Sequence, residues 1–198
     1  MNVDEFITSG QWMTERGGGS DVSVNGTNTI AILQDNGMYK LYGYKWFSSA
    51  SDADISLTLA RIEDTNGNIK SGNKGLSCFL VVNTKIENGV YMEQLKDKLG
   101  TRQLPTAELE LKGTNAILVS KIGDGVKTII KMANITRIHN AISAVGNIRD
   151  SLNKAVGYAK NRTVFGKKLI DIPLHQMTLG RINILYRVSL LLVMDSVK

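Results

Sequence analysis

The run of residues best suited to binding chemistry is 11–22, with the sequence QWMTERGGGSDV. Its three consecutive glycines allow positive φ values and present bare backbone N–H groups, which suits an anion such as phosphate. The run lacks the Gly-Lys-Ser/Thr of a P-loop and the strand–GxGxxG–helix context of a dinucleotide-binding turn. The sequence therefore leaves two readings open, an anion-binding loop of neither class or a flexible hairpin loop.

A second run, GYKWFSSA at 43–50, places Trp46 and Phe47 beside the hydroxyls of Ser48 and Ser49. Aromatic rings and hydroxyls at a strand end can pack against a flat heterocycle and hydrogen-bond to its edge. The alternative is a pair of core aromatic residues followed by a turn, and the local sequence alone favours that alternative.

Two arginines are candidates for anion binding. Arg162 lies in the run NRTVFG at 161–166, where a long helix is predicted to end. Its guanidinium could clamp a phosphate, or it could simply complement the negative end of the helix dipole. Arg137 stands among apolar residues of the same predicted helix, where a buried and unpaired guanidinium would be costly.

Other site classes find little support in the sequence. No GxSxG run is present, and Cys78 lies in an apolar strand-like run where an inert core thiol is expected. His139 and His175 are interpreted as structural residues, and two histidines with one cysteine argue against a zinc site. A single cysteine also excludes an internal disulfide framework and fits a reducing compartment. No secretory signal and no apolar run of membrane-spanning length, ~18–20 residues, is visible.

Charge divides the 198 residues into two parts. Residues 1–113 carry a net charge of −3 and most of the glycines, whereas residues 114–198 carry a net charge of +9. This break predicts a domain boundary near residue 113. The basic second part could bind nucleic acid, but its charges are scattered along predicted helices without a recognised reading motif.

The two parts also differ in hydrophobic periodicity. Alternation, β-branched residues and Asn-Gly turns predict short strands over 27–34, 38–42, 54–61, 77–82 and 107–112. Apolar steps of three and four residues predict one long helix over about 126–159. A second helix, 174–198, is apolar on several faces, so we expect it to be covered by other helices, from an oligomer or from further chain.

Five runs together resemble the acyl-CoA dehydrogenase family: MTERGGGSDV, GYKWFSSA, LGTRQLPTAEL, Thr136-Arg137 with Gly146, and NRTVFGKKL. The runs QWMTE, LKDKLG and Ile172-Pro173-Leu174 are most similar to the branch with alkylation-response and long-chain dehydrogenase-like flavoproteins. The resemblance implies an α+β chain: an antiparallel β-barrel or sandwich middle domain (1–113), then the first helices of a C-terminal four-helix domain (114–198). It also implies that the catalytic glutamate lies beyond Lys198, so this chain holds no catalytic residue.

The resemblance implies roles for ten residues. Those expected to bind FAD are Gln11, Trp12, Met13, Thr14, Ser20, Phe47, Ser49, Arg162 and Phe165. Ser20 and Arg137 are expected on the acyl-CoA side, and Arg162 and Phe165 against the FAD of a neighbouring subunit. Asn134, Val164 and Pro173 depart from the usual family residues, which weakens the expectation of a standard acyl-CoA preference.

The implied activity is FAD-dependent α,β-dehydrogenation of an acyl-CoA by a homo-oligomer, a dimer or tetramer, in the cytoplasm or mitochondrial matrix. The electron acceptor and acyl chain length are not specified, and no metal is implied. One alternative is a flavin-binding protein of the alkylation-response type that protects or contacts DNA rather than turning over substrate. Another is a truncated product without activity of its own.

Overall fold

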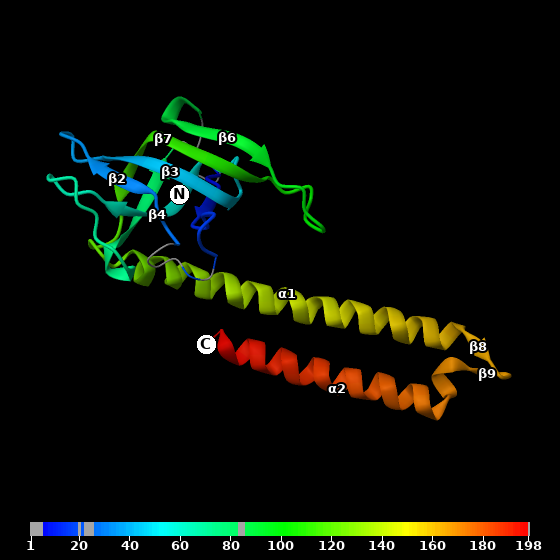
Figure 1. The fold of residues 1–198 in the computed structure, drawn as a ribbon. Coiled ribbons are helices and arrows are strands. Elements are labelled where there is room, and N and C mark those ends of the chain that lie inside the picture. Colours follow the sequence, from blue (N-terminus) through cyan, green and yellow to red (C-terminus); the bar gives the residue numbers. More distant parts are fainter. Residues whose placement is uncertain (1–5, 20, 22–25, 83–85, 198) are drawn as a thin grey trace. The chain divides into compact units, whose positions relative to one another are not determined.

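The computed structural model describes residues 6–19, 21, 26–82 and 86–197. The chain forms two compact units, Met1–Ile130 and Lys131–Lys198. The first unit is built mainly of strands and the second mainly of two long helices (Figure 1). The α+β class predicted from the sequence is therefore confirmed.

Seven strands of the first unit join in one sheet. They are β1 (Ser9–Trp12), β2 (Ile30–Leu33), β3 (Tyr39–Ser49), β4 (Ile55–Ile62), β5 (Leu76–Val82), β6 (Val90–Leu95) and β7 (Thr106–Leu118). Two 3₁₀ turns, Asn73–Gly75 and Ile86–Asn88, precede β5 and β6. β7 continues through Gly113, where we expected a domain boundary, and the division into family domains stays a prediction.

The strand pairing closes on itself. β3 pairs with β2, β2 with β4, β4 with β5, β5 with β7, and β7 again with β3. β1 joins this ring by pairing with both β3 and β4, and β6 extends it along β7. The sheet is therefore a small barrel, as expected for many short strands with frequent turns.

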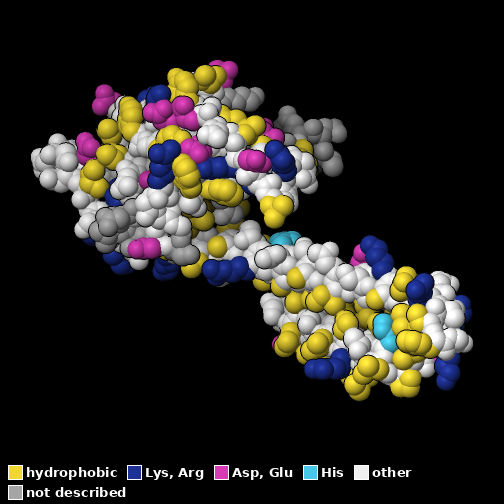
Figure 2. Space-filling view, turned by 45° about the vertical axis from the view of Figure 1, so that its right-hand side comes forward, with side chains coloured by type: hydrophobic (Ala, Val, Ile, Leu, Met, Phe, Trp, Pro, Cys, Tyr) yellow, Lys and Arg dark blue, Asp and Glu magenta, His cyan; other side chains and the backbone are white. Residues whose placement is uncertain are grey.

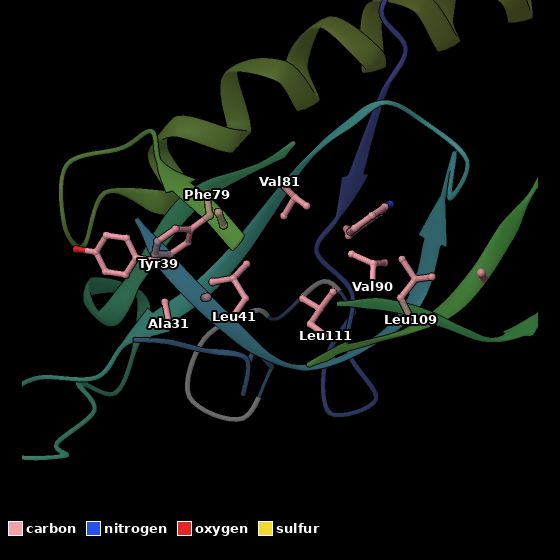
Figure 3. Packing of buried hydrophobic residues seen from close by; sticks show 12 residues of the cluster. Ala31, Tyr39, Leu41, Phe79, Val81, Val90, Leu109 and Leu111 are labelled. Carbon is pink, nitrogen blue, oxygen red and sulfur yellow. The ribbon is translucent and has the colours of Figure 1, made fainter. Parts of the chain in front are cut away.

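The barrel interior is filled by side chains from nearly every strand (Figure 3). Trp12, Leu41 and Phe79 are fully buried, and the rings of Tyr39 and Phe79 meet edge to face at 5.1 Å. A second buried cluster contains Leu59, Cys78 and Ile129, with Met13, Leu57 and Val126 partly buried against it. The barrel therefore fills its own interior and also packs against the first residues of the long helix that follows β7.

Most predicted strands are present, but, besides the longer β7, three strands differ from prediction. β3 continues to Ser49 instead of ending near Tyr42, because its second half buries a charged side chain, Lys45, which interrupts the hydrophobic pattern. β1 and β6 were not predicted as strands. β1 is short and contains glycine, and β6 buries only its first residue, so neither shows a clear alternation.

The second unit holds α1 (Gly125–Asn161), which begins at the end of the first unit, and α2 (Pro173–Ser196). A small hairpin, β8 (Thr163–Val164) with β9 (Lys167–Lys168), and a 3₁₀ turn, Leu169–Asp171, connect the two helices. Pro173 stands in the first turn of α2, where the missing N–H has no cost. The helices run antiparallel (Figure 1) and bury Val145, Ala159 and Leu179.

Many apolar side chains of this helical pair remain exposed, among them Leu174, Leu185 and Leu191 (Figure 2). That further helices cover α2 stays a prediction. By length and composition α2 also passes as a possible membrane span, with a mean hydropathy of 1.4 in its most apolar window. Core helices of water-soluble proteins meet the same criteria of length and composition. The absence of a membrane span therefore stays a prediction.

Candidate functional site

The ends of β1 and β3 bring together two of the runs that the sequence singles out. Gln11 lies opposite Ser49 in the β1–β3 pair, and the Trp46 N–H donates to the Thr14 carbonyl at 2.8 Å. Phe47 is 44% exposed, Ser49 is exposed, and Ser48 between them is buried. We call Gln11, Thr14, Phe47 and Ser49 the platform. It offers one aromatic ring, two hydroxyls and an amide at the barrel surface.

Trp12 lies on the other side of β1. Its ring is fully buried in the barrel core and its Nε1–H donates to the Ser49 carbonyl at 3.3 Å. The Trp12 carbonyl accepts a hydrogen bond of 2.6 Å from the Thr58 hydroxyl. Because neighbouring residues of a strand face opposite sides, Gln11 and Met13 point outward when Trp12 points inward. The indole of Trp12 therefore does not line an external ligand, which corrects the expectation for its side chain.

Met13 stays partly exposed while its side chain packs against the second buried cluster. Thr14 is half-buried, and Ser20 lies outside the described residues. A tight turn begins after Thr14, with Glu15 bridged to Gly18 and the Gly18 N–H donating to the Glu15 carbonyl at 3.2 Å. The glycine-rich loop predicted from the sequence therefore begins directly after Thr14 of the platform.

Of the glycines in this turn, Gly18 has no room for a side chain. A Cβ there would lie 2.1 Å from the Asp21 carbonyl oxygen and 2.4 Å from the Gly26 Cα. A Cβ on Gly19 would meet nothing within 4 Å. The close approach of two backbone segments, rather than positive φ, therefore explains glycine at position 18.

Two buried charges that the sequence did not single out lie beneath the platform. Lys45 Nζ is 2.7 Å from the Glu15 carboxylate, and both side chains are almost completely buried. Burial raises the pKa of Glu15, but the charge and hydrogen bond of Lys45 and two further donors outweigh it and lower the pKa. Burial lowers the pKa of Lys45, and Glu15 offsets only part of that effect. An ion pair inside the barrel thus adjoins the site.

A second charged group lies on the outer barrel face beside the turn. Glu108 accepts hydrogen bonds from the Tyr44 hydroxyl and from Lys96 Nζ, the latter at 2.6 Å, and lies 3.5 Å from Arg16. Lys96 Nζ is 3.2 Å and the Arg16 guanidinium 4.6 Å from the centre of the Trp46 ring. These contacts hold Trp46 beside two cations.

The same contacts shift two ionisation equilibria. The hydrogen bond from Lys96, followed by that from Tyr44, lowers the pKa of Glu108. The hydrogen bond to Glu108 raises the pKa of Tyr44. A pocket of about 330 Å³ adjoins this group and is lined by Glu15, Arg16, Gly17, Asn28, Gly43 and Tyr44.

The remaining predicted residues belong to the second unit. Arg137 is exposed, and its Nη1 donates to the Asn134 side chain at 3.1 Å. The cost of a buried and unpaired guanidinium therefore does not arise in this structure, and the role of Arg137 on the acyl-CoA side stays a prediction. Arg162 follows the last turn of α1 and is exposed, and Phe165 at the tip of the β8–β9 hairpin is 98% exposed.

The described part of the chain offers no site for metal or thiol chemistry. Among the residues that the structure describes, no group of three or more His, Cys, Asp or Glu side chains could hold a metal ion. Cys78 is buried, and burial raises the pKa of its thiol to about 11. The prediction of an inert core thiol agrees with this placement.

Comparison with protein families matches the two parts of the chain to two consecutive domains. Residues 10–114 match the acyl-CoA dehydrogenase middle domain, and residues 123–198 match the acyl-CoA dehydrogenase C-terminal domain. The first match alone covers more than half of the 198 residues.

Individual relatives agree. Acyl-CoA dehydrogenase family member 11 of Caenorhabditis elegans is 49% identical over 96% of this chain and 31% of its own length. AidB of Escherichia coli is 37% identical over 87% of this chain and 30% of its own. The crystal structure of C. elegans ACDH-11 in complex with C11-CoA superposes with a TM-score of 0.88, over 94% of this chain and 32% of that one. The chain thus spans about a third of the length of these relatives.

Proposed function

The chain belongs to the acyl-CoA dehydrogenase family, and from that premise we propose that it forms the cofactor-binding part of a FAD-dependent acyl-CoA dehydrogenase. The observation that carries the proposal is the β1–β3 platform. Two runs far apart in the sequence meet there and expose an aromatic ring between hydroxyl and amide groups. The C11-CoA bound to the 49% identical relative supports an acyl-CoA thioester as the substrate class.

The platform fits a flavin ring. A flat heterocycle with polar edges needs an apolar face to stack on and donors at its rim, and Phe47 with Ser49 and Thr14 supply both. Trp12 contributes only its main chain, because its indole lies in the core. Ala50, directly after the platform, has a φ of 49°, and Phe165 has a φ of 51°. Residues in this left-handed region concentrate at functional sites; Ala50 adjoins the proposed FAD contact Ser49, and Phe165 is itself a proposed FAD contact.

The chemistry divides between cofactor and protein. Bound FAD supplies the acceptor for the hydride that leaves the acyl β-carbon, while a base takes the α-proton. We place that base, a glutamate, beyond Lys198. Phe47 would stack on the ring, and Gln11, Met13, Thr14 and Ser49 would contact its edge and face. The role expected of Ser20 at the pyrophosphate stays a prediction, because Ser20 lies outside the described residues.

The helical unit has two proposed roles. Arg137, exposed on α1, lies on the substrate side. Arg162 and Phe165 contact the FAD of a neighbouring subunit, which makes the site dependent on a homo-oligomer. Both are exposed and so are available for such a contact. We propose the cytoplasm or mitochondrial matrix as its location, with which a chain holding one cysteine is compatible.

DNA binding is the second candidate. One observation favours it: residues 114–198 carry 13 Lys and Arg against four Asp and Glu. No reading motif accompanies this charge, so contacts would be limited to phosphates and would weaken steeply with added salt.

An anaerobic titration of the purified whole protein with a series of saturated acyl-CoA thioesters tests the proposal. We expect at least one thioester to bleach the visible absorption band of the bound flavin and to yield the matching enoyl-CoA. Two results together would favour the DNA-binding alternative over the dehydrogenase. No acyl-CoA would reduce the bound flavin, and the protein would slow the migration of duplex DNA in a gel at low salt but not at high salt.

A further inference from the structure

The buried Glu15–Lys45 pair occupies an unusual place relative to the platform. Glu15 directly follows Thr14, and Lys45 stands two residues before Phe47. Each of the two chain segments that form the platform therefore also carries one of the two buried charged residues. The two charges meet at 2.7 Å inside the barrel, where Lys45 is completely inaccessible to solvent.

The two side chains tie four strands together. The Glu15 carboxylate accepts hydrogen bonds from the Asn28 N–H at 2.7 Å, the Thr29 N–H at 3.3 Å and the Thr29 hydroxyl at 2.5 Å. These donors lie just before β2. Lys45 Nζ, on β3, also donates to the Leu59 carbonyl of β4 at 2.9 Å. The pair therefore joins the turn after β1 and the centre of β3 to the segment before β2 and to β4.

Stability alone gives no reason for an ion pair here. Removing two charges from water is costly, and well-packed apolar residues of similar volume usually serve a core at least as well. Buried polar groups with fully satisfied hydrogen bonds instead restrict a structure to one arrangement. The pair is consequently a candidate for setting geometry.

The platform needs such a device, because the β1–β3 ladder is short. Its register consists of the Gln11–Ser49 pair, supplemented by hydrogen bonds from the Trp12 Nε1–H to the Ser49 carbonyl and from the Trp46 N–H to the Thr14 carbonyl. β1 itself is fixed to β4 by four residue pairs, but Thr14 lies beyond the end of that ladder. The register of β3 against β7 also shifts between Lys45 and Ser48. A ladder of one pair beside an irregular strand fixes the relative position of two segments only weakly.

We propose that the Glu15–Lys45 pair is a positioning device that holds Thr14 and Phe47 in the relative position in which the platform accepts the flavin ring. The proposal rests on the proposed FAD site. It assigns the pair no contact with the cofactor, and the pair acts only through the backbone of the two segments.

The decisive variant is the uncharged double substitution Glu15→Gln/Lys45→Met in the whole protein. The matched control is Glu110→Gln/Lys112→Met, which removes an ion pair of the same 2.7 Å length from the exposed surface of β7. Three quantities are compared with the wild type: the FAD dissociation constant, the amide hydrogen exchange of the Trp46 N–H and of residues 11–14, and the midpoint of denaturant unfolding.

We expect the double variant to keep its unfolding midpoint close to that of the wild type, to exchange the Trp46 amide at least tenfold faster and to bind FAD at least tenfold more weakly. The circular dichroism of any flavin still bound should change. The control should match the wild type in all three quantities. Unchanged exchange and unchanged FAD affinity in the double variant would overturn the proposal.

Glu15→Asp covers the case in which the double variant does not fold. It keeps the charge but withdraws the carboxylate from Asn28 and Thr29, so faster exchange at Trp46 and weaker FAD binding are expected. Wild-type exchange and affinity in Glu15→Asp would also overturn the proposal. A wild-type protein that binds no FAD would refute the proposed function, whereas amide exchange would still decide whether the pair sets the geometry.

Discussion

Replacing Arg162 with alanine is expected to weaken FAD binding without weakening the fold. The residue follows the last turn of α1, where its N–H donates to the Tyr158 carbonyl at 2.9 Å and its carbonyl accepts from the Leu169 N–H at 2.8 Å. Alanine keeps both backbone bonds. Among the described residues the guanidinium itself is exposed and has no hydrogen-bond or ion-pair partner. A surface change of this kind alters the free energy of unfolding by no more than about 0.5 kcal/mol.

The expected loss of affinity follows from the proposed partner, a phosphate of FAD in a neighbouring subunit. A charge-assisted contact of this type contributes about 1.5–3 kcal/mol. At about 1.4 kcal/mol per factor of ten, the dissociation constant should rise roughly 10- to 150-fold. Arg162→Lys should recover only part of the affinity, because a single ammonium group cannot reproduce a two-point contact.

The assay is the flavin content of the purified whole protein and the FAD dissociation constant, with the oligomeric state measured by light scattering. Arg149→Ala is the matched control, since Arg149 is an exposed arginine within α1 itself. Full FAD occupancy and unchanged affinity in Arg162→Ala, with the oligomer intact, would show that Arg162 only complements the helix end. The cross-subunit cofactor contact would then be wrong.

Three further predictions concern the barrel. Trp12→Ala should lower the free energy of unfolding by about 3–5 kcal/mol in denaturant titrations, because the ring is fully buried, and a loss near zero would contradict its core position. Gly18→Ala should destabilise the protein by about 1–3 kcal/mol through its clash with backbone, whereas Gly19→Ala should have almost no effect; equal effects would refute the steric argument. The pKa of Cys78 is raised from 9.0 to about 11, so its contribution to stability is complete below pH 9.0 and is lost as the pH rises towards about 11. Cys78→Ala should flatten that decline, and rapid labelling of the folded thiol would contradict its burial.

Regular hydrophobic patterns made much of the fold predictable. The alternating run that became β4 and the apolar run that became β5 were predicted nearly to their ends. The long periodic run likewise predicted α1, because its apolar residues recur without an interrupting proline. β4 and β5 contribute residues to both buried clusters, and α1 repeats apolar steps of three and four residues. Both patterns lie within one continuous run, so local sequence is enough to predict these elements.

The candidate site was predictable in position but not in detail. The resemblance located Trp12 near the flavin, whereas strand alternation and core packing turn its ring inward. Charged residues are normally solvated, so nothing in the sequence marked Glu15 and Lys45 as a buried pair. Their partnership depends on β1 and β3 becoming neighbours, a long-range pairing that no local pattern shows.

The most direct test of the flavin site is hydrogen–deuterium exchange of the whole wild-type protein with and without FAD. The account predicts that FAD slows exchange in the peptides that contain residues 11–14 and 46–49, with little change in the peptide of β6, whose strand partner is β7. Failure to bind FAD, or protection by FAD that leaves both platform peptides unchanged, would contradict it.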